Sequence, residues 1–256
     1  MNALPLRVWT DREGRLLRLR LARPKSNVLD AAMVAALDQT FTELGGNRDL
    51  HAVLLDAEGP NFSFGASVQE HLPHSCGLML KNFHALILRM LRSEVPVLVA
   101  IRGQCLGGGL ELACAGHLLF AAPDARLGQP ELQLGVFAPA ASCLLPERIG
   151  RAQAEDLLLS GRTITADEAQ RMGLVNVVAD DPEGAALVYF DRHLLPRSAH
   201  SLRHTVRAAR NGLANRISVK LASLEKAYLN DLMRSHDAVE GLEAFLGRRP
   251  AQWRNR

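Results

Sequence analysis

A stretch with very little charge, residues 103–135, limits the folds that this chain can adopt. From residue 103 to residue 123 the only Asp, Glu, Lys or Arg is Glu111, which stands in an apolar run directly after the three glycines at 107–109. Burying an unpaired charge on an apolar helix raises its pKa or requires a polar partner from elsewhere in the fold. The sequence therefore predicts a buried helix whose one carboxylate needs a distant partner.

A second carboxylate, Glu131, follows in the loop-like segment Gly128–Glu131, after a short apolar strand. Two carboxylates brought to one cavity can divide proton chemistry, because one accepts a proton while the other donates one. Each residue taken singly also allows a simpler interpretation. Glu111 could be a structural glutamate held by backbone amides, and Glu131 could be an exposed residue after a proline.

The glycines at 107–109 offer backbone that a ligand can approach closely. The N–H groups of a helix's first turn have no acceptor within the helix. Such donors, aimed at a carbonyl oxygen that becomes an enolate, form an oxyanion hole. The same glycines could instead only permit close helix packing. They are not a dinucleotide fingerprint, because a G-x-G-x-x-G beginning at Gly107 would need glycine where Leu112 stands.

Length and composition argue against several classes of protein. A chain of 256 residues can bury the core of one α/β domain with a helical extension. The net charge of +3 is too small to indicate nucleic-acid binding. Residues 1–25 interleave arginine with leucine and lack the apolar run of a signal peptide, and no stretch has the length of a membrane span.

The cysteine and histidine patterns do not favour a metal site. The four cysteines are widely spaced, so we expect buried thiols in a reducing cytosol. His71 and His74 are separated by Pro73, and no nearby carboxylate completes a ligand set.

Periodicity predicts the elements before the glycine run. Arg15–Leu21 alternates leucine with arginine, which predicts an outer strand with one solvated face. Asp30 is expected to cap a helix. Apolar strands at 52–55 and 97–101, with a helix at 78–92 between them, each lead toward a glycine loop. This alternation predicts right-handed crossovers and a ligand site at the carboxyl ends of the strands.

From Pro139 onward the chain is expected to be mainly helical, with Thr165–Glu168 forming a capping box. Three arginines recur further on at helical spacing: Arg203, Arg207 and Arg210. A solvated helix face is favoured over an RNA-binding surface, because no aromatic residues interleave with these arginines as stacking platforms.

Three segments together resemble the enoyl-CoA hydratase/isomerase (crotonase) superfamily. Ala100–Ala113 and Leu127–Glu131 look like its signature, and Phe62–Ser67 is similar to its other glycine loop. The resemblance covers nearly the whole chain. It implies an α/β fold, a crotonase-like spiral of ββα units at 1–190 with a C-terminal helical trimerisation region at 191–256.

The resemblance also implies roles for individual residues. Ala66 and Gly108 match the residues whose backbone N–H groups form the family's thioester oxyanion hole. Glu111 and Glu131 match the paired glutamates of the hydratases, with Glu111 acting on water and Glu131 donating a proton. Because isomerases of this superfamily often keep one glutamate, the pair favours a hydratase. The further positions expected to contact substrate are Lys25, Val28, Ser63, Gly65, Ser67, Val68 and Phe137.

Two departures from simple enoyl-CoA hydratases bear on the substrate. Ser67 stands where aspartate is usual, and residues 135–143 replace a glycine-rich segment with methyl groups, a ring and proline. Segments 61–67 and 137–142 look most like cyclohexa-1,5-diene-1-carbonyl-CoA hydratases of anaerobic benzoyl-CoA breakdown. That likeness implies water addition to give 6-hydroxycyclohex-1-ene-1-carbonyl-CoA, with the proton added at the far carbon of the diene.

The resemblance implies an acyl-CoA substrate, no cofactor beyond the CoA that the substrate carries, a cytoplasmic homotrimer or dimer of trimers, and no nucleic-acid or membrane partner. The alternatives are a hydratase or isomerase acting on another enoyl-CoA, and an RNA-binding relative. A thioester hydrolase is disfavoured, because Gly65–Gln69 does not complete a G-x-S-x-G motif.

Overall fold

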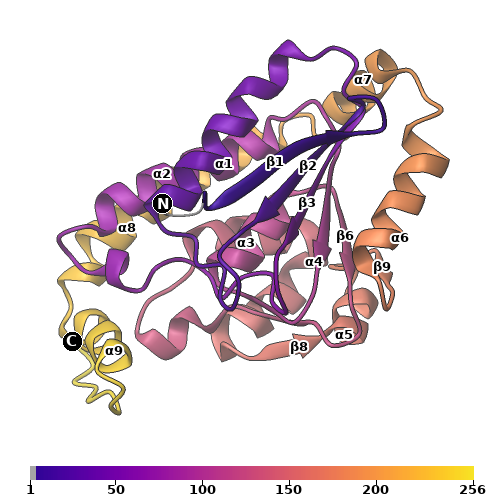
Figure 1. Cartoon of the computed structure of the whole chain (residues 1–256). Coiled ribbons are helices and arrows are strands. Elements are labelled where there is room, and N and C mark those ends of the chain that lie inside the picture. The colour runs from indigo at the N-terminus through magenta and orange to yellow at the C-terminus, as the bar shows by residue number, and fades with distance from the viewer. Residues whose placement is uncertain (1–3) are drawn as a thin grey trace.

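Two β-sheets wrapped by helices form the part of the chain that the computed structural model describes, residues 4–256 (Figure 1). The larger sheet has the strand order β1-β2-β3-β4-β6-β9, and the smaller one has the order β5-β7-β8. The strands are β1 Leu6–Asp11, β2 Leu16–Leu21, β3 Ala52–Ala57, β4 Val97–Ile101, β5 Gln104–Leu106, β6 Leu118–Ala121, β7 Arg126–Gly128, β8 Thr163–Thr165 and β9 Val177–Val178. Among the strands of residues 4–256, only β1 and β8 pair antiparallel to their neighbours.

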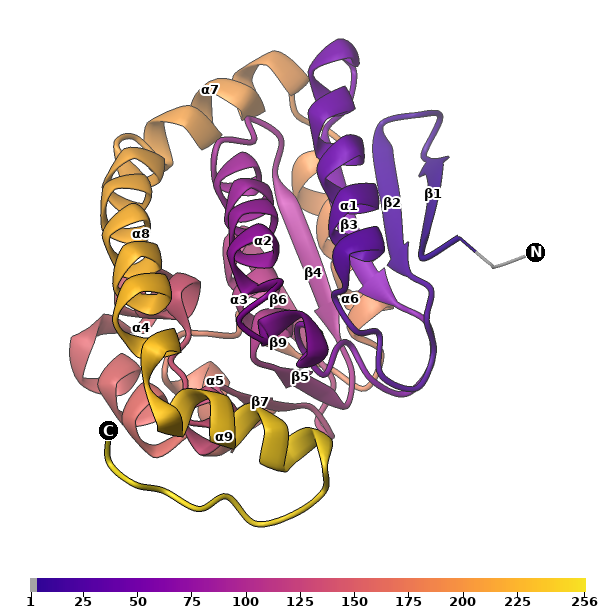
Figure 2. The same cartoon turned by 90° about the vertical axis from the view of Figure 1, so that its left-hand side faces the viewer.

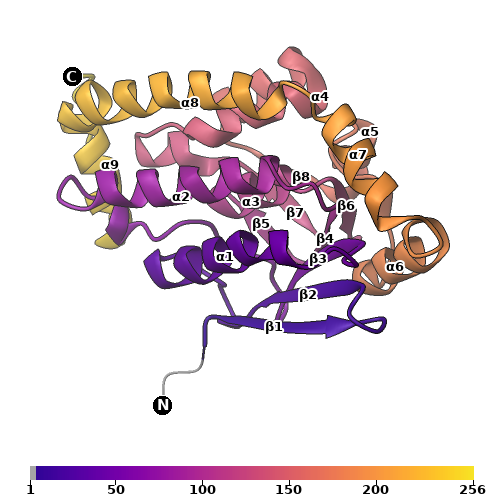
Figure 3. The ribbon, with the colours of Figure 1, turned by 90° about the horizontal axis from the view of Figure 1, so that it is seen from above.

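The helices cover both faces of the large sheet. They are α1 Ala31–Glu43, α2 Cys76–Leu91, α3 Gly108–Ala115, α4 Pro139–Ser160, α5 Ala166–Arg171, α6 Pro182–Tyr189, α7 Ala199–Ala209, α8 Leu213–Asn230 and α9 His236–Leu246. Helices α1, α2 and α8 lie side by side on one face (Figures 2 and 3), whereas α6 packs on the other face (Figure 1). Among residues 4–256, no helix combines the length and hydrophobicity needed to cross a membrane.

Strand β3 illustrates why the large sheet is buried on both faces. Val53 and Leu55 point into the main core shared with α1 and α2, while Ala52 and Leu54 point into a second core that contains Phe190. Side chains alternate across a strand, so a continuous apolar run fills both layers. The loops after β3 and β4 are consequently held at one edge of a rigid sheet.

The prediction of an outer strand at Arg15–Leu21 is wrong about its position. Strand β2 lies between β1 and β3, and Arg18 on it is only 4% exposed. The Arg18 guanidinium lies 3.2 Å from the carboxylate of Asp56 and also contacts Glu183. Alternating arginines therefore mark a buried ion-pair network here, and the partners are remote in sequence.

Several helix predictions are confirmed. Asp30 caps α1 by accepting a 2.9 Å hydrogen bond from Met33 N, and Thr165 caps α5 by accepting from Glu168 N at 3.2 Å. The four cysteines are buried free thiols. The solvated face expected for Arg203, Arg207 and Arg210 is wrong for Arg210, which follows α7 and donates a 3.0 Å hydrogen bond to the carbonyl oxygen of Ala115 at the end of α3.

Candidate active site

Helix α3 carries Glu111 into the interior at the carboxyl end of the large sheet. It begins directly after Gly107, which has φ +51. Glu111 is 5% exposed, and its Oε1 accepts a 2.7 Å hydrogen bond from Ala141 N in the first turn of α4. The distant polar partner that the sequence called for is thus a backbone amide. Burial nevertheless raises the pKa of Glu111 to about 7 against the opposing effect of this hydrogen bond.

Glu131 lies in the short 3₁₀ helix Pro130–Leu134, which follows β7. It lines the same cavity as Glu111, so the fold brings the two predicted carboxylates together. Burial, and secondly the negative charge of Glu111, raise the pKa of Glu131 to about 8. Two interacting carboxyls titrate as a pair, so at neutral pH the site favours one proton shared between them.

Gln129, which sequence reasoning did not single out, is 1% exposed and lies beside Glu131. Its side-chain amide nitrogen donates to Oε1 and Oε2 of Glu131 at 3.0 and 2.9 Å. Gln129 therefore positions this carboxyl.

The two predicted oxyanion-hole residues lie next to each other. A Cβ added to Gly108 would lie only 3.0 Å from Ala66 N and 3.3 Å from Ala66 Cβ. Gly65 precedes them with φ +100, and its N–H donates to Ser63 Oγ at 3.0 Å. Within residues 4–256, neither Ala66 N nor Gly108 N donates a hydrogen bond to the protein. Both amides are therefore free to hold an oxygen atom.

The cavity between these groups has a volume of about 70 Å³. Its lining combines the loops after β3 and β5 with residues of helices α2, α3 and α8. Helices α2 and α8 run side by side (Figure 2). Of the predicted substrate-binding residues, Gly65, Val68 and Phe137 line it. The sequence signal missed His84 of α2 and Tyr228 of α8, which also line it, because neither lies in a glycine motif.

The other predicted contacts lie beside the cavity without lining it. Ser63 is buried, and its Oγ donates to the carbonyl oxygen of Asn27 at 2.8 Å, which ties the glycine loop to the preceding turn. Ser67 is buried one residue after Ala66. Lys25, with φ +97, and Val28 belong to that turn. Their proposed contacts with substrate remain predictions.

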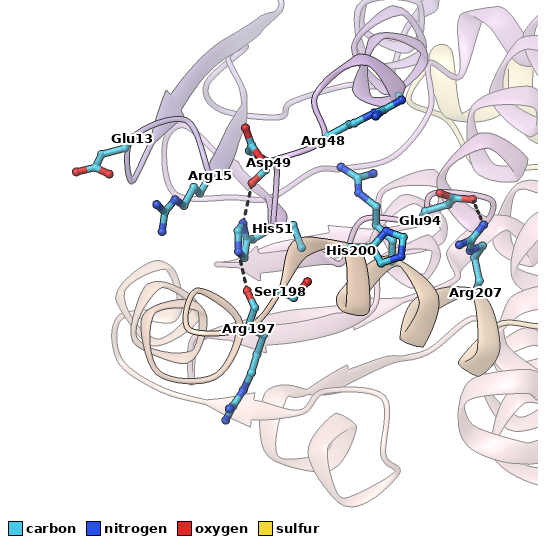
Figure 4. A pocket seen from close by; sticks show the side chains of 13 residues that line it. Glu13, Arg15, Arg48, Asp49, His51, Glu94, Arg197, Ser198, His200 and Arg207 are labelled. Atoms are coloured by element: carbon cyan, nitrogen blue, oxygen red, sulfur yellow. Dashed lines mark hydrogen bonds and ion pairs between the residues drawn. The ribbon is translucent and has the colours of Figure 1, made fainter.

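A larger hollow, of about 950 Å³, lies at the opposite end of the sheet (Figure 4). Its side chains come from residues just before β2, β3 and β4 and from α7. The ring of His51 contacts the backbone oxygens of Asp49 and Arg197 at 2.7 and 2.9 Å, and Glu94 pairs with Arg207 at 3.4 Å. The groups here are positively charged overall and do not bring two buried carboxyls together. Within residues 4–256, no cluster of His, Cys, Asp and Glu has the arrangement of a metal site.

Comparisons with known proteins agree with this geometry. The family model described as enoyl-CoA hydratase/isomerase matches residues 11–256. The chain is 63% identical over 252 residues to cyclohexa-1,5-dienecarbonyl-CoA hydratase of Thauera aromatica, covering 98% of each chain. It is 31% identical to a probable enoyl-CoA hydratase of Bacillus subtilis, over 99% of each chain.

The solved structures confirm the predicted fold class. A putative enoyl-CoA hydratase from Mycobacterium avium paratuberculosis K-10 superposes with a TM-score of 0.87 at 24% identity, covering 98% of this chain and 99% of the other. An enoyl-CoA hydratase from Bacillus halodurans gives a TM-score of 0.85 at 20% identity, covering 94% of this chain and 99% of that one. At these identities the likeness concerns the fold.

Proposed function

The chain belongs to the enoyl-CoA hydratase/isomerase family, and on this premise we propose that it adds water to cyclohexa-1,5-diene-1-carbonyl-CoA. The enzyme is a hydratase of the crotonase type. The assignment of the substrate depends on the 63% identity to the Thauera hydratase, which is twice the identity to the Bacillus relative. The observation that supports the reaction is a pair of carboxyls at one cavity, the buried Glu111 and the partly buried Glu131.

Binding of the thioester would rest on backbone groups. The carbonyl oxygen of the substrate lies between Ala66 N and Gly108 N, which have no other acceptor among residues 4–256. Negative charge develops on this oxygen when water attacks the ring. Fixed N–H donors stabilise that charge in a site from which water is excluded, so they act more strongly on the transition state than on the substrate.

The carboxyl pair divides the proton chemistry. Glu111, whose anion is held by Ala141 N–H, takes a proton from water as the water oxygen bonds to the β-carbon of the diene. The resulting dienolate carries its charge on the thioester oxygen and on the far diene carbon. Glu131, with the higher pKa, gives its proton to that carbon, and the product is 6-hydroxycyclohex-1-ene-1-carbonyl-CoA. Proton exchange with solvent then removes the proton from Glu111 and returns one to Glu131, which restores the starting protonation states.

The size of the cavity adds a requirement for binding. A cavity of about 150 Å³ accommodates benzene in an engineered protein core, whereas this cavity has about 70 Å³. A six-membered ring must therefore displace side chains as it enters. Phe64, which is 47% exposed, and Phe137 are the bulky groups at the cavity that the ring would move.

We propose further that the spiral core spans 1–190, that residues 191–256 build a homotrimer or a dimer of trimers, and that the enzyme works in the cytoplasm on a CoA thioester without another cofactor. Exposed apolar side chains on and after the C-terminal helices support subunit contacts, among them Val219, Phe245 and Trp253. Four free thiols suit a reducing compartment. Sedimentation analysis of the purified protein tests the oligomer.

A direct test offers the purified protein cyclohexa-1,5-diene-1-carbonyl-CoA and crotonyl-CoA in parallel, in water enriched in oxygen-18. We expect the cyclic substrate to gain one molecule of labelled water and to be the preferred substrate. A product of unchanged mass would indicate an isomerase. Preference for crotonyl-CoA would contradict the assignment of the cyclic diene.

A further inference from the structure

Two residues that line the acyl cavity each carry a buried polar atom without a hydrogen-bond partner in residues 4–256: His84 Nε2 and Tyr228 Oη. The two side chains come from α2 and α8, which pack against each other. An unsatisfied polar atom in a dry site costs free energy, which a suitable ligand can recover. Both residues line one cavity, so a ligand bound there is the natural source of a partner for each atom.

The neighbours of His84 determine which hydrogen bond it can make. Its Nδ1 lies 2.7 Å from Oε2 of Glu225, an acceptor, so the ring proton stands on Nδ1. Burial lowers the pKa of His84 more strongly than Glu225 raises it, and the ring is therefore neutral. Nε2 then carries a lone pair and can only accept a hydrogen bond.

Tyr228 supplies the complementary group. Its ring is 1% exposed and packs edge to face on Phe137, with 5.3 Å between the ring centroids. Burial, with smaller contributions from Cys76, Glu131 and Glu111, raises the pKa of Tyr228 far above its ordinary value, so the hydroxyl keeps its proton. It can donate that proton to a ligand oxygen.

We propose that His84 and Tyr228 together bind the hydroxyl group of the hydrated acyl ligand, an inference that rests on the proposed hydratase function. The ligand's O–H donates to His84 Nε2, and the ligand's oxygen accepts from Tyr228 O–H. An alcohol satisfies both protein atoms, a ring ketone satisfies only Tyr228, and a methylene group satisfies neither. The pair thus selects oxygen-bearing rings, and it holds the oxygen that water addition creates.

The test compares two ligands that differ by this hydroxyl: 6-hydroxycyclohex-1-ene-1-carbonyl-CoA and cyclohex-1-ene-1-carbonyl-CoA. We expect Tyr228→Phe to weaken binding of the alcohol about tenfold, the usual order for one lost hydrogen bond in a buried site. Binding of the second ligand should stay within about twofold. Because Oη has no partner in the free protein, Tyr228→Phe should not lower the melting temperature.

The matched control is Tyr189→Phe, the same chemical change on α6 outside the cavity. It should leave both affinities unchanged. His84→Gln keeps an acceptor near the position of Nε2 and should retain most of the discrimination, whereas His84→Asn retains a group facing Glu225, lacks that acceptor, and should lose the discrimination. Equal effects of Tyr228→Phe on both ligands, or no effect on either, would overturn the proposal.

Failure of this inference is separable from failure of the proposed function. The binding measurement needs no turnover, and hydration of the cyclic diene by the unsubstituted enzyme is scored by product mass. If the enzyme hydrates the diene while Tyr228→Phe binds the alcohol normally, only the role of the pair is wrong. If the enzyme does not hydrate the diene, the proposed function itself is wrong.

Discussion

The two hollows at opposite ends of the large sheet differ in size and in how strongly their charged groups are exposed to solvent. The arginine-rich hollow at the amino ends of the strands has about 950 Å³, and the glutamate cavity at the carboxyl ends has about 70 Å³. In the open hollow, solvent screens charges such as those of Arg207 and Glu94, which are 49% and 44% exposed. In the small cavity, burial shifts the pKa values of two carboxyls into the neutral range. Desolvation, more than volume, distinguishes the proposed active site.

The sheet topology explains the contrast. Parallel strands with right-handed crossovers gather the loops that follow the strands at one edge, and here these loops contain Ala66, Gly108 and Glu131. The opposite edge receives the segments before the strands, such as Arg15 and His51. Helix α9 packs against the 3₁₀ helix that carries Glu131 at the first edge, whereas α7 lies at the second (Figure 2).

The strongest test of this contrast removes one carboxyl at a time. Glu111→Gln and Glu131→Gln should each lower kcat by about 10²- to 10⁴-fold, the usual contribution of a general acid or base. Thioester binding should largely survive, because it rests on backbone donors. The matched change in the open hollow, Glu94→Gln, should leave kcat within about twofold. Full activity in either cavity variant would remove that glutamate from the mechanism.

The next largest effect concerns the proposed oxyanion hole. Gly108→Ala places a Cβ 3.0 Å from Ala66 N, so it should obstruct the approach of the thioester oxygen to both amides. We expect kcat to fall by about 10²- to 10³-fold, as it does when one oxyanion donor is lost elsewhere. Gly45→Ala is the control in the arginine-rich hollow, since a Cβ there meets no atom within 4 Å and the φ of Gly45 is not positive. Steady-state kinetics on both variants checks the difference.

A smaller effect is expected on stability. The folded protein holds protons on Glu111 and Glu131 above pH 4.5, where the unfolded chain has released them. The stability that these protons contribute is present at low pH and is lost as the pH rises through about 7 to 8.

Glutamine in place of either residue should therefore raise the melting temperature at pH 9, with little effect at pH 4. Thermal denaturation across this range measures the difference. Glu94→Gln should show no such trend, because Glu94 is exposed. The prediction fails if Glu111→Gln or Glu131→Gln is less stable than the unsubstituted protein at pH 9, because the ionised carboxylate would then not be destabilising.

Local signals predicted much of this architecture. The isolation of Glu111 in an apolar run required a buried helix and a distant partner, and the cap residues Asp30 and Thr165 marked the starts of two helices correctly. These signals are local because helix capping involves residues only a few positions apart. The family resemblance added the pairing of Glu111 with Glu131, which spacing alone left open.

Local signals of this kind did not predict the contacts between segments that are remote in the sequence. Alternation at Arg18 indicated an exposed strand, whereas the partners that permit its burial, Asp56 and Glu183, come from β3 and α6. Tyr228 and His84 likewise meet only because α8 packs on α2. Periodicity reports that a face is amphipathic, but it does not report which other element will cover that face.

The smallest expected effect belongs to the arginine-rich hollow. Arg207→Gln removes the ion pair with Glu94, whose side chains are both well exposed. Exposed pairs contribute less than about 1 kcal/mol because the charges stay hydrated and are screened by salt. We therefore expect a small drop in melting temperature at low salt, none at high salt, and unchanged hydration kinetics. A large loss of activity in Arg207→Gln would mean that this hollow takes part in catalysis, and the contrast between the two ends of the sheet would fail.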